Sequence, residues 1–278
     1  MGTVTEIRRY PVKSMLGEAL PSVMVTHAGV SGDRTHAVLD RSGAIGSAKH
    51  PRKWDKLLSC RSRVADGGVE VELPGRAPLT AGDPELDAGL SELLGRPVTV
   101  SASAPADSAL ERAVPEYEGG LPDLVRATAS VDGTGEKITV GRVSPGTFFD
   151  FGRVHLVTTS SLARLRAVCP SGDFDARRFR PNLVVDTGEE PAFAEDGWQG
   201  RRLRVGKALF RVLVPTPRCV VPTLSHDELK ADPDIMRVIA REHRVPVFDL
   251  GRLACFGVYL DVLEPGPVRL GDSITVQD

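Results

Sequence analysis

The apolar segments of this sequence are short, and turns that contain glycine or proline separate most of them. Residues 69–73 alternate apolar and acidic side chains, which is the pattern of a strand with one buried face. Residues 183–185 and 209–214 are mostly apolar runs of strand length, as in buried strands. No apolar run approaches the ~20 residues that a helix needs to cross a bilayer. The sequence therefore predicts a mainly β protein without a membrane span.

Helices are expected at only a few places in the chain. Residues 83–94 begin with Asp-Pro and are followed by glycine, which is typical of a short helix. Residues 158–160 offer hydroxyl groups that can cap a helix running to residue 168, and Asp-Pro-Asp at 232–234 is a third helix start. Because strands outnumber helices and do not alternate with them regularly, we expect an α+β fold, a barrel-like β structure decorated by helices.

The character of the sequence changes between residues 101 and 146. Ala, Ser, Pro, Gly and Asp dominate there, and periodicity is lost apart from residues 137–143. We therefore predict a β-rich domain at 1–105, a connecting region at 106–145 and a second domain at 146–278. Short loops within one fold are the alternative.

The charge balance and the missing motifs exclude several classes of protein. Lys and Arg number 35 against 37 Asp and Glu, a net charge of -2, so the chain lacks the basic excess that a general nucleic-acid binder needs. The sequence has no H-E-x-x-H, no G-x-S-x-G and no G-x-G-x-x-G after a strand. Its first residues show no basic head followed by an apolar stretch. We expect a cytoplasmic protein that binds neither nucleic acid nor membrane.

The cysteines are spread along the chain, and none forms a C-x-x-C pair, which gives no support for zinc ribbons, iron–sulfur clusters or thioredoxin-like chemistry. Cys60, Cys169 and Cys255 have surroundings typical of small packing residues. Cys219 differs, because prolines bracket its turn and Arg218 precedes it. A neighbouring arginine favours the thiolate, which ligates metals and attacks electrophiles. A ligand or nucleophile and a buried packing residue both stay open for Cys219.

Cationic side chains cluster at further places in the sequence. Residues 177–180 contain three arginines and precede Asn182 at the start of an apolar strand. Guanidinium groups bind phosphate-like anions with two parallel hydrogen bonds, so this cluster is a candidate anion site, with a solvated arginine cluster as the alternative. Lys13 with Ser14, and Arg34 after Gly-Asp, are weaker features of the same kind.

The six histidines show no metal-ligand spacing. His226 lies nearest to Cys219 in the sequence. We expect it to be a surface histidine in a loop, with a proton donor as the alternative.

Short motifs occur in a fixed order along the chain. They are Tyr10-Pro11-Val12-Lys13-Ser14, Gly32-Asp33-Arg34, Phe179-Arg180-Pro181-Asn182, Pro217-Arg218-Cys219, Phe256-Gly257-Val258-Tyr259, and Pro265-Gly266 with Val268 and Gly271-Asp272. Together they resemble the MOSC superfamily, whose domain is shared by the C-terminal part of molybdenum cofactor sulfurases and by mitochondrial amidoxime-reducing components. The resemblance spans nearly the whole chain. It implies a MOSC-type β-barrel at 146–278, preceded by an N-terminal β-barrel-like domain at 1–105.

The resemblance also implies a ligand, the molybdenum cofactor (Mo-molybdopterin), and the residues that bind it. Cys219 corresponds to the cysteine that bonds molybdenum beside the two dithiolene sulfurs of the pterin, and it is therefore the implied metal ligand and catalytic residue. The other implied cofactor-binding residues are Lys13, Ser14, Arg34, Phe151, Gly152, Arg180, Asn182 and Arg218. Cations suit a phosphate and a thiolate suits a soft metal, so residue chemistry agrees with these roles. Lys49 stands where many relatives carry arginine, and no pyridoxal phosphate is expected.

By this resemblance the chain is expected to be a molybdenum-dependent oxidoreductase that reduces N-oxygenated small molecules such as hydroxylamines or amidoximes. The sequence ends soon after Gly271-Asp272 without a cysteine-rich ferredoxin domain, so the electrons are expected from a separate electron-transfer protein. Two alternatives keep the same fold. One is sulfur transfer through a persulfide on Cys219, and the other is a protein that stores or delivers the cofactor without catalysis.

Overall fold

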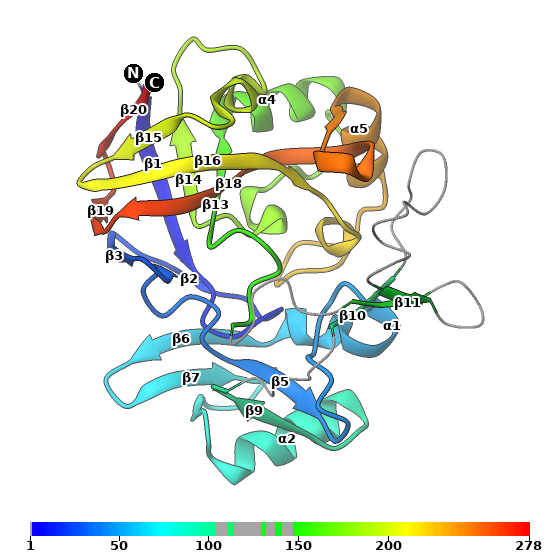
Figure 1. Ribbon diagram of the computed structural model, residues 1–278. Helices are drawn as coiled ribbons and strands as arrows, with labels where there is room; N and C mark the ends of the chain where they lie inside the picture. Colours follow the sequence, from blue (N-terminus) through cyan, green and yellow to red (C-terminus); the bar gives the residue numbers. More distant parts are fainter. Residues whose placement is uncertain (1, 104–109, 114–128, 132–136, 141–146) are drawn as a thin grey trace.

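The structure, a computed structural model, describes residues 2–103, 110–113, 129–131, 137–140 and 147–278 (Figure 1). A β-barrel fills the upper part of Figure 1, and a smaller β-rich lobe with a helix along its base lies below it. Strands dominate and the described helices are few. The expected mainly β fold with helices is confirmed.

Seven strands close the barrel. In order around the ring they are β13 (Val154–Thr158), β14 (Leu183–Asp186), β1 (Gly2–Arg9), β20 (Ser273–Gln277), β15 (Arg202–Val205), β16 (Ala208–Pro217) and β18 (Arg252–Glu264). β18 pairs with β13 and so completes the ring. β13 and β14 run parallel, and the other neighbours run antiparallel. Buried side chains such as Leu156, Phe210 and Val258 join one apolar cluster, which is the barrel's core.

β1 comes from the start of the chain but lies inside this barrel. It pairs with β14, where Ile7 faces Leu183, and with β20, where Gly2 faces Ile274. The second pairing brings the two chain ends side by side (Figure 1). β3 (Ser22–Thr26) likewise pairs with β19 (Gly266–Arg269). The domain limits at residues 105 and 146 stay a prediction, and two strands of the first region pair with strands of the last.

The lower lobe, residues 37–101, has an apolar core of its own. Its strands are β5 (Ala37–Asp40) with β9 (Val98–Ser101), and β6 (Arg61–Ala65), β7 (Gly68–Glu72) and β8 (Leu79–Thr80) in a second sheet, and its helices are α1 (Pro51–Trp54), η1 (Asp55–Ser59) and α2 (Pro84–Leu94). Trp54 and Leu86 are fully buried in this core. α2 starts and ends as the sequence predicts, because Asp83 caps its first turn and Gly95 adopts a left-handed conformation after its last residue.

Further helices lie outside the ring of barrel strands. They are α4 (Thr159–Val168), which joins β13 to β14, α5 (Asp234–Glu242), and the short η2 (Ala176–Phe179), η3 (Ala194–Trp198), η4 (Val221–Thr223) and η5 (Phe248–Leu250). Leu165, Ile239 and Phe256 belong to the apolar cluster between these helices and the strands. None of the helices in the described ranges has the length and apolar character needed to span a bilayer.

The remaining strands are short. They are β2 (Glu18–Ala19) beside β1, β4 (Gly29–Val30) beside β3, β17 (Arg244–Pro246) beside β18, and the sheet of β10 (Leu110–Ala113), β12 (Lys137–Val140) and β11 (Ala129–Val131). The residues 137–143, where the sequence keeps its periodicity, include β12 where the structure describes them. Residues 141–146 lie outside the described ranges.

Candidate functional site

An open pocket is bounded by the ends of barrel strands and by loops that lead into the lower lobe. We call it the cysteine pocket. It is lined by Lys13, Ser14, Arg34, Ser47, Lys49, Asp150, His155, Phe179, Arg180, Pro217, Arg218, Cys219, Val221 and Tyr259. Residues more than 200 positions apart in the sequence therefore share one wall, because β1 and the loop after it enter the barrel beside the second half of the chain.

Cys219 lies two residues after the end of β16 and two residues before η4. It is half-buried, forms no disulfide, and packs at the edge of an apolar cluster with Ala48 and Val221. The strand ends here because its last residues pair irregularly with β18, with register shifts around Pro215 and Pro217. The turn predicted around Cys219 is therefore present and faces the cysteine pocket.

Five cations and one carboxylate line the cysteine pocket. The cations are Lys13, Arg34, Lys49, Arg180 and Arg218, and the carboxylate is Asp150. Asp33 is buried behind them and pairs with Arg34. The pocket therefore has a clear excess of positive charge, which suits an anion with more than one negative charge.

Asp150 bridges the two lysines of the cysteine pocket. Its Oδ1 lies 2.7 Å from Lys13 Nζ and its Oδ2 lies 3.0 Å from Lys49 Nζ. Burial raises the pKa of the Asp150 carboxyl, but the two lysines outweigh burial and hold the pKa well below its usual range. Burial lowers the pKa of Lys13, and Asp150 opposes that shift. The carboxylate occupies a place between two cations where an anionic ligand could also bind.

Arg34 and Arg180 are held together around the ring of Tyr10. Their guanidinium carbons lie 4.9 Å and 4.3 Å from the ring centroid. Arg34 Nη2 also donates to the carbonyl oxygen of Arg180 at 3.3 Å, and Arg180 Nη1 donates to that of Met15 at 2.5 Å. Burial and then the charge of Arg34 lower the pKa of Arg180 to about 10, so it remains charged at neutral pH.

Three residues of the cysteine pocket have a left-handed backbone that is unusual for side chains with a Cβ. The φ angles are 65° for Ser14, 49° for Arg34 and 54° for Arg180. Such conformations cost free energy and persist where the surrounding structure fixes them, which is frequent at binding sites. Ser14 Oγ accepts a hydrogen bond from the backbone N–H of Ala48 at 3.0 Å, which ties its turn to the loop that carries Lys49.

Three predicted site residues lie behind the pocket wall. Asn182 is buried; its Oδ1 accepts from the backbone N–H of His155 at 3.1 Å and from Arg34 Nη1 at 3.5 Å. Phe151 packs on Tyr259, with ring centroids 5.7 Å apart, and Gly152 lies against the same tyrosine. Direct contact of these three residues with a ligand stays a prediction, whereas the structure gives each of them a neighbour that lines the cysteine pocket.

Sequence reasoning did not assign a role to several lining residues. His155 was one of six scattered histidines, yet it lines the pocket, and burial followed by Arg218 holds its pKa well below the usual range. Asp150 precedes Phe151-Gly152 and Tyr259 ends the motif of residues 256–259, but nothing in the sequence marked either of them as a site residue. His226 was expected at the surface, and this was wrong: it is only 1% exposed, and burial followed by Arg180 lowers its pKa to about 3.

The other cysteines fit the expected packing role to different degrees. Cys60 and Cys255 are buried, and burial raises the pKa of each thiol to about 12. Cys169 follows α4 and is only half-buried. No group of three or more His, Cys, Asp or Glu side chains within the described residues could hold a metal ion.

Two family descriptions match the sequence. The MOSC N-terminal beta barrel domain matches residues 1–109, and the MOSC domain matches residues 145–275. Mitochondrial amidoxime-reducing component 1 of Mus musculus is 25% identical over 293 residues, which cover 99% of this chain and 82% of that protein.

Two molybdenum cofactor sulfurases are also similar. The protein of Oryza sativa subsp. japonica is 28% identical over 250 residues, which cover 78% of this chain and 28% of that protein. The protein of Drosophila grimshawi is 25% identical over 283 residues, which cover 96% of this chain and 34% of that protein. This chain therefore spans about a third or less of each sulfurase. Among solved structures, the match to the YUAD protein of Bacillus subtilis covers 99% of this chain and 96% of that protein, with a TM-score of 0.47 and 11% identity.

Proposed function

Because the chain belongs to the MOSC family, with the family's N-terminal beta barrel domain ahead of its MOSC domain, we propose that it binds the molybdenum cofactor in the cysteine pocket and reduces N-oxygenated small molecules. The observation that carries the proposal is the cysteine pocket itself. Five cations and one half-buried cysteine line it together. A pterin phosphate needs the cations and a soft metal needs the thiolate.

The residues present fit such a ligand. Arg34 and Arg180, stacked on Tyr10, form a rigid pair of guanidinium groups for the phosphate. Lys13 and Lys49 pair with Asp150 and would add positive charge beside the ligand. Cys219 supplies one thiolate. The dithiolene of the pterin would supply two further sulfurs, in agreement with the finding that no protein side chains gather into a metal site within the described residues.

The chain's own residues bind and orient in this proposal. When bound, the cofactor supplies two-electron reduction of an N–O bond, and with two protons the oxygen leaves as water. His155 and Tyr259 form part of the wall, and their rings contact each other at a tilt, with centroids 5.6 Å apart. Burial raises the pKa of Tyr259, so its hydroxyl stays protonated at neutral pH and can donate a hydrogen bond to a substrate oxygen.

A separate electron-transfer protein delivers the electrons in this proposal. The sequence offers four cysteines, Cys60, Cys169, Cys219 and Cys255, and two of them are buried with raised pKa values. They do not form a ligand set for an iron–sulfur cluster. The amidoxime-reducing component among the relatives supports the reaction class.

Metal analysis of cofactor-loaded protein tests the proposal. We expect molybdenum in stoichiometric amount in the wild type, and loss of molybdenum and of hydroxylamine reduction by an artificial reductant in Cys219→Ala. Cys169→Ala is the matched control, because Cys169 is also half-buried but lies outside the cysteine pocket. Wild-type protein without molybdenum, or a Cys219→Ala variant with unchanged content and activity, contradicts the proposal.

Sulfur transfer is the second candidate, and the two sulfurase relatives favour it. In this reading Cys219 carries a persulfide. Incubation with a cysteine desulfurase and free cysteine would then add the mass of one sulfur atom to the Cys219 peptide and not to the Cys169 peptide. Tight pterin binding without turnover and without persulfide would instead indicate a protein that stores or delivers the cofactor.

A further inference from the structure

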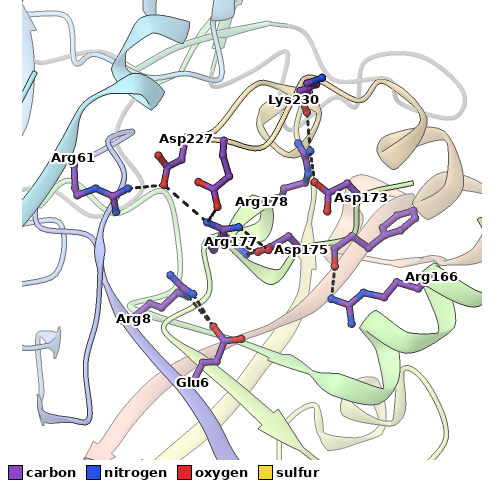
Figure 2. Close-up of polar contacts among 12 residues, drawn as sticks. Glu6, Arg8, Arg61, Arg166, Asp173, Asp175, Arg177, Arg178, Asp227 and Lys230 are labelled. Carbon is purple, nitrogen blue, oxygen red and sulfur yellow. Dashed lines mark hydrogen bonds and ion pairs between the residues drawn. The ribbon is translucent and has the colours of Figure 1, made fainter. Parts of the chain in front are cut away.

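Arg178 is a buried arginine that does not line the cysteine pocket. It belongs to η2, and its side chain is 1% exposed. Its Nη1 donates to the carbonyl oxygens of Pro222 at 3.3 Å and Leu224 at 3.2 Å. Its Nη2 donates to the carbonyl oxygen of Lys230 at 2.7 Å and pairs with Asp173 Oδ2 at 3.0 Å (Figure 2).

The three carbonyls belong to one segment, residues 220–232, which follows Cys219. Two further pairs hold the outer edge of this segment. Arg177 pairs with Glu228 at 2.5 Å, and Arg61 pairs with Asp227 at 2.5 Å (Figure 2). These outer pairs are partly exposed, and pairs of that kind contribute only ~0–1 kcal/mol each. The buried guanidinium is therefore the main polar tether of the 220–232 segment.

The same short helix holds the chain on both sides of Cys219. On one side, Arg218 Nη2 donates to the carbonyl oxygen of Phe179 at 3.0 Å. On the other side, Pro222 accepts from Arg178. The residue that follows η2 lines the cysteine pocket. Cys219 thus lies in a short stretch whose two ends are bonded to consecutive residues of η2.

An arginine is needed at this position for geometric reasons. A planar guanidinium presents five donors in fixed directions and can reach three carbonyls at once, whereas a lysine ammonium is a single point with three donors. Methionine would leave the carbonyls of Pro222, Leu224 and Lys230 without their donor. Buried acceptors without a donor cost free energy, so the 220–232 segment would move to find water.

We propose that Arg178 is a positioning residue that fixes the 220–232 segment against η2 and thereby sets the place of the Cys219 sulfur relative to Arg180. It acts through the backbone and touches no ligand. The importance of this position for a bond from Cys219 to the cofactor rests on the proposed function. The restraint itself does not.

The restraint can be measured on the full chain without cofactor. The rate of Cys219 alkylation by iodoacetamide, followed by peptide mass spectrometry, reports how often the segment opens. In Arg178→Lys we expect this rate to rise about tenfold, since hydrogen bonds from a charged donor are lost. The half-buried Cys169 serves as internal control and keeps its rate. Arg164→Lys, in which an exposed arginine loses only its contact to Glu242, leaves both rates unchanged.

An unchanged Cys219 rate in folded Arg178→Lys, or an equal rise at Cys169, overturns the proposal. If Arg178→Lys does not fold, hydrogen exchange of the wild-type chain decides. Protection of the 220–232 amides as strong as that of η2 supports the tether, and exchange as fast as in an exposed loop overturns it.

Loaded protein adds a readout that a general loss of stability would not move. In Arg178→Lys with retained molybdenum, the Mo(V) electron paramagnetic resonance signal should shift, because the Cys219 sulfur changes its position. A wild-type signal at full occupancy overturns the proposal. If the wild-type protein takes up no molybdenum, the proposed function is refuted instead. The alkylation experiment on the chain without cofactor still tests the restraint.

Discussion

Ser14, Arg34 and Arg180 combine a left-handed backbone with a place in the pocket wall, and two of them also carry a charge away from bulk water. Each strained residue costs on the order of 1–3 kcal/mol. The contacts that hold them are specific: the Ser14 hydroxyl accepts a hydrogen bond from a backbone N–H, and both guanidinium groups lie against the ring of Tyr10. Side chains fixed in this way lose little entropy when an anion binds, which favours affinity.

Asp150 gives a prediction at the scale of one residue. Its pKa is lowered on folding, so its ionised form stabilises the protein above the unfolded pKa, near 4, and that contribution is lost as pH falls. We expect Asp150→Asn to lower the free energy of unfolding by about 2 kcal/mol at pH 7, since Lys13 loses its partner. The difference from wild type should shrink steadily as the pH falls below about 4. Urea unfolding across pH measures it.

The exposed Asp249 provides the control for this experiment. Asp249→Asn should follow the wild-type curve. Added inorganic phosphate should raise the melting temperature of Asp150→Asn more than that of wild type, because the anion can take the place of the carboxylate between Lys13 and Lys49. A constant difference between wild type and Asp150→Asn at every pH would contradict the electrostatic explanation.

Which residues the sequence could reveal depends on how local their signals are. Cys219 could be singled out because prolines flank it in the chain. Lys13 and Arg180 could be proposed from residue type and motif, and both line the cysteine pocket. The burial of His226 and the part of Asp150 between two lysines depend on segments far apart in the sequence, so no local pattern carried them.

At the scale of elements, the cysteine pocket depends on how strands end. β13 begins just after Gly152, and β16 stops where its last residues pair irregularly with β18. The alternation and caps of the sequence locate such elements, as the cap of α2 by Asp83 shows. They do not tell which strands pair, because pairing partners are distant in the chain. The contact of Gly152 with Tyr259 in β18 is one such result of pairing.

Gly152 gives a prediction at this scale. A Cβ added there would lie 2.5 Å from Tyr259 Cβ, so the ring of the tyrosine or the start of β13 must move. We expect Gly152→Ala to destabilise the protein by about 1–3 kcal/mol, as overpacking does, and to weaken cofactor retention. Gly67→Ala is the matched control, because nothing lies within 4 Å of its added Cβ. Chemical unfolding and molybdenum content measure the two effects, and equal behaviour of both variants would contradict the prediction.

At the scale of the molecule, the barrel is completed by a strand from the opposite end of the sequence. β1 fills the gap between β14 and β20, and its Val4 and Ile7 are buried in the barrel core. The division predicted at residues 105 and 146 is based on composition. Composition describes each stretch of sequence by itself and does not tell that strands of the first region pair with strands of the last. The loop after β1 also carries Lys13 and Ser14 into the cysteine pocket. Fold and site thus depend on the same crossing of the chain.

This arrangement predicts how fragments of the protein behave. A fragment of residues 147–278 lacks β1, which leaves β14 and β20 with unpaired edges and opens the barrel core. We expect it to show no cooperative unfolding transition in urea. Residues 2–30 joined ahead of 147–278 should restore the transition. A short linker suffices, because an added Cβ at Gly29 would lie 2.9 Å from the carbonyl oxygen of Arg153, so the two segments are already in contact.

The comparison separates two explanations of folding. If the barrel needs its seventh strand, the joined fragment unfolds cooperatively and the fragment of residues 147–278 does not. Replacing Val4 and Ile7 by serine in the joined fragment should abolish the transition again, since both side chains are at most 2% exposed in the barrel core. Cooperative unfolding of residues 147–278 alone would show that the barrel closes without β1. β1 would then serve to bring Lys13 and Ser14 to the cysteine pocket rather than to hold the barrel together.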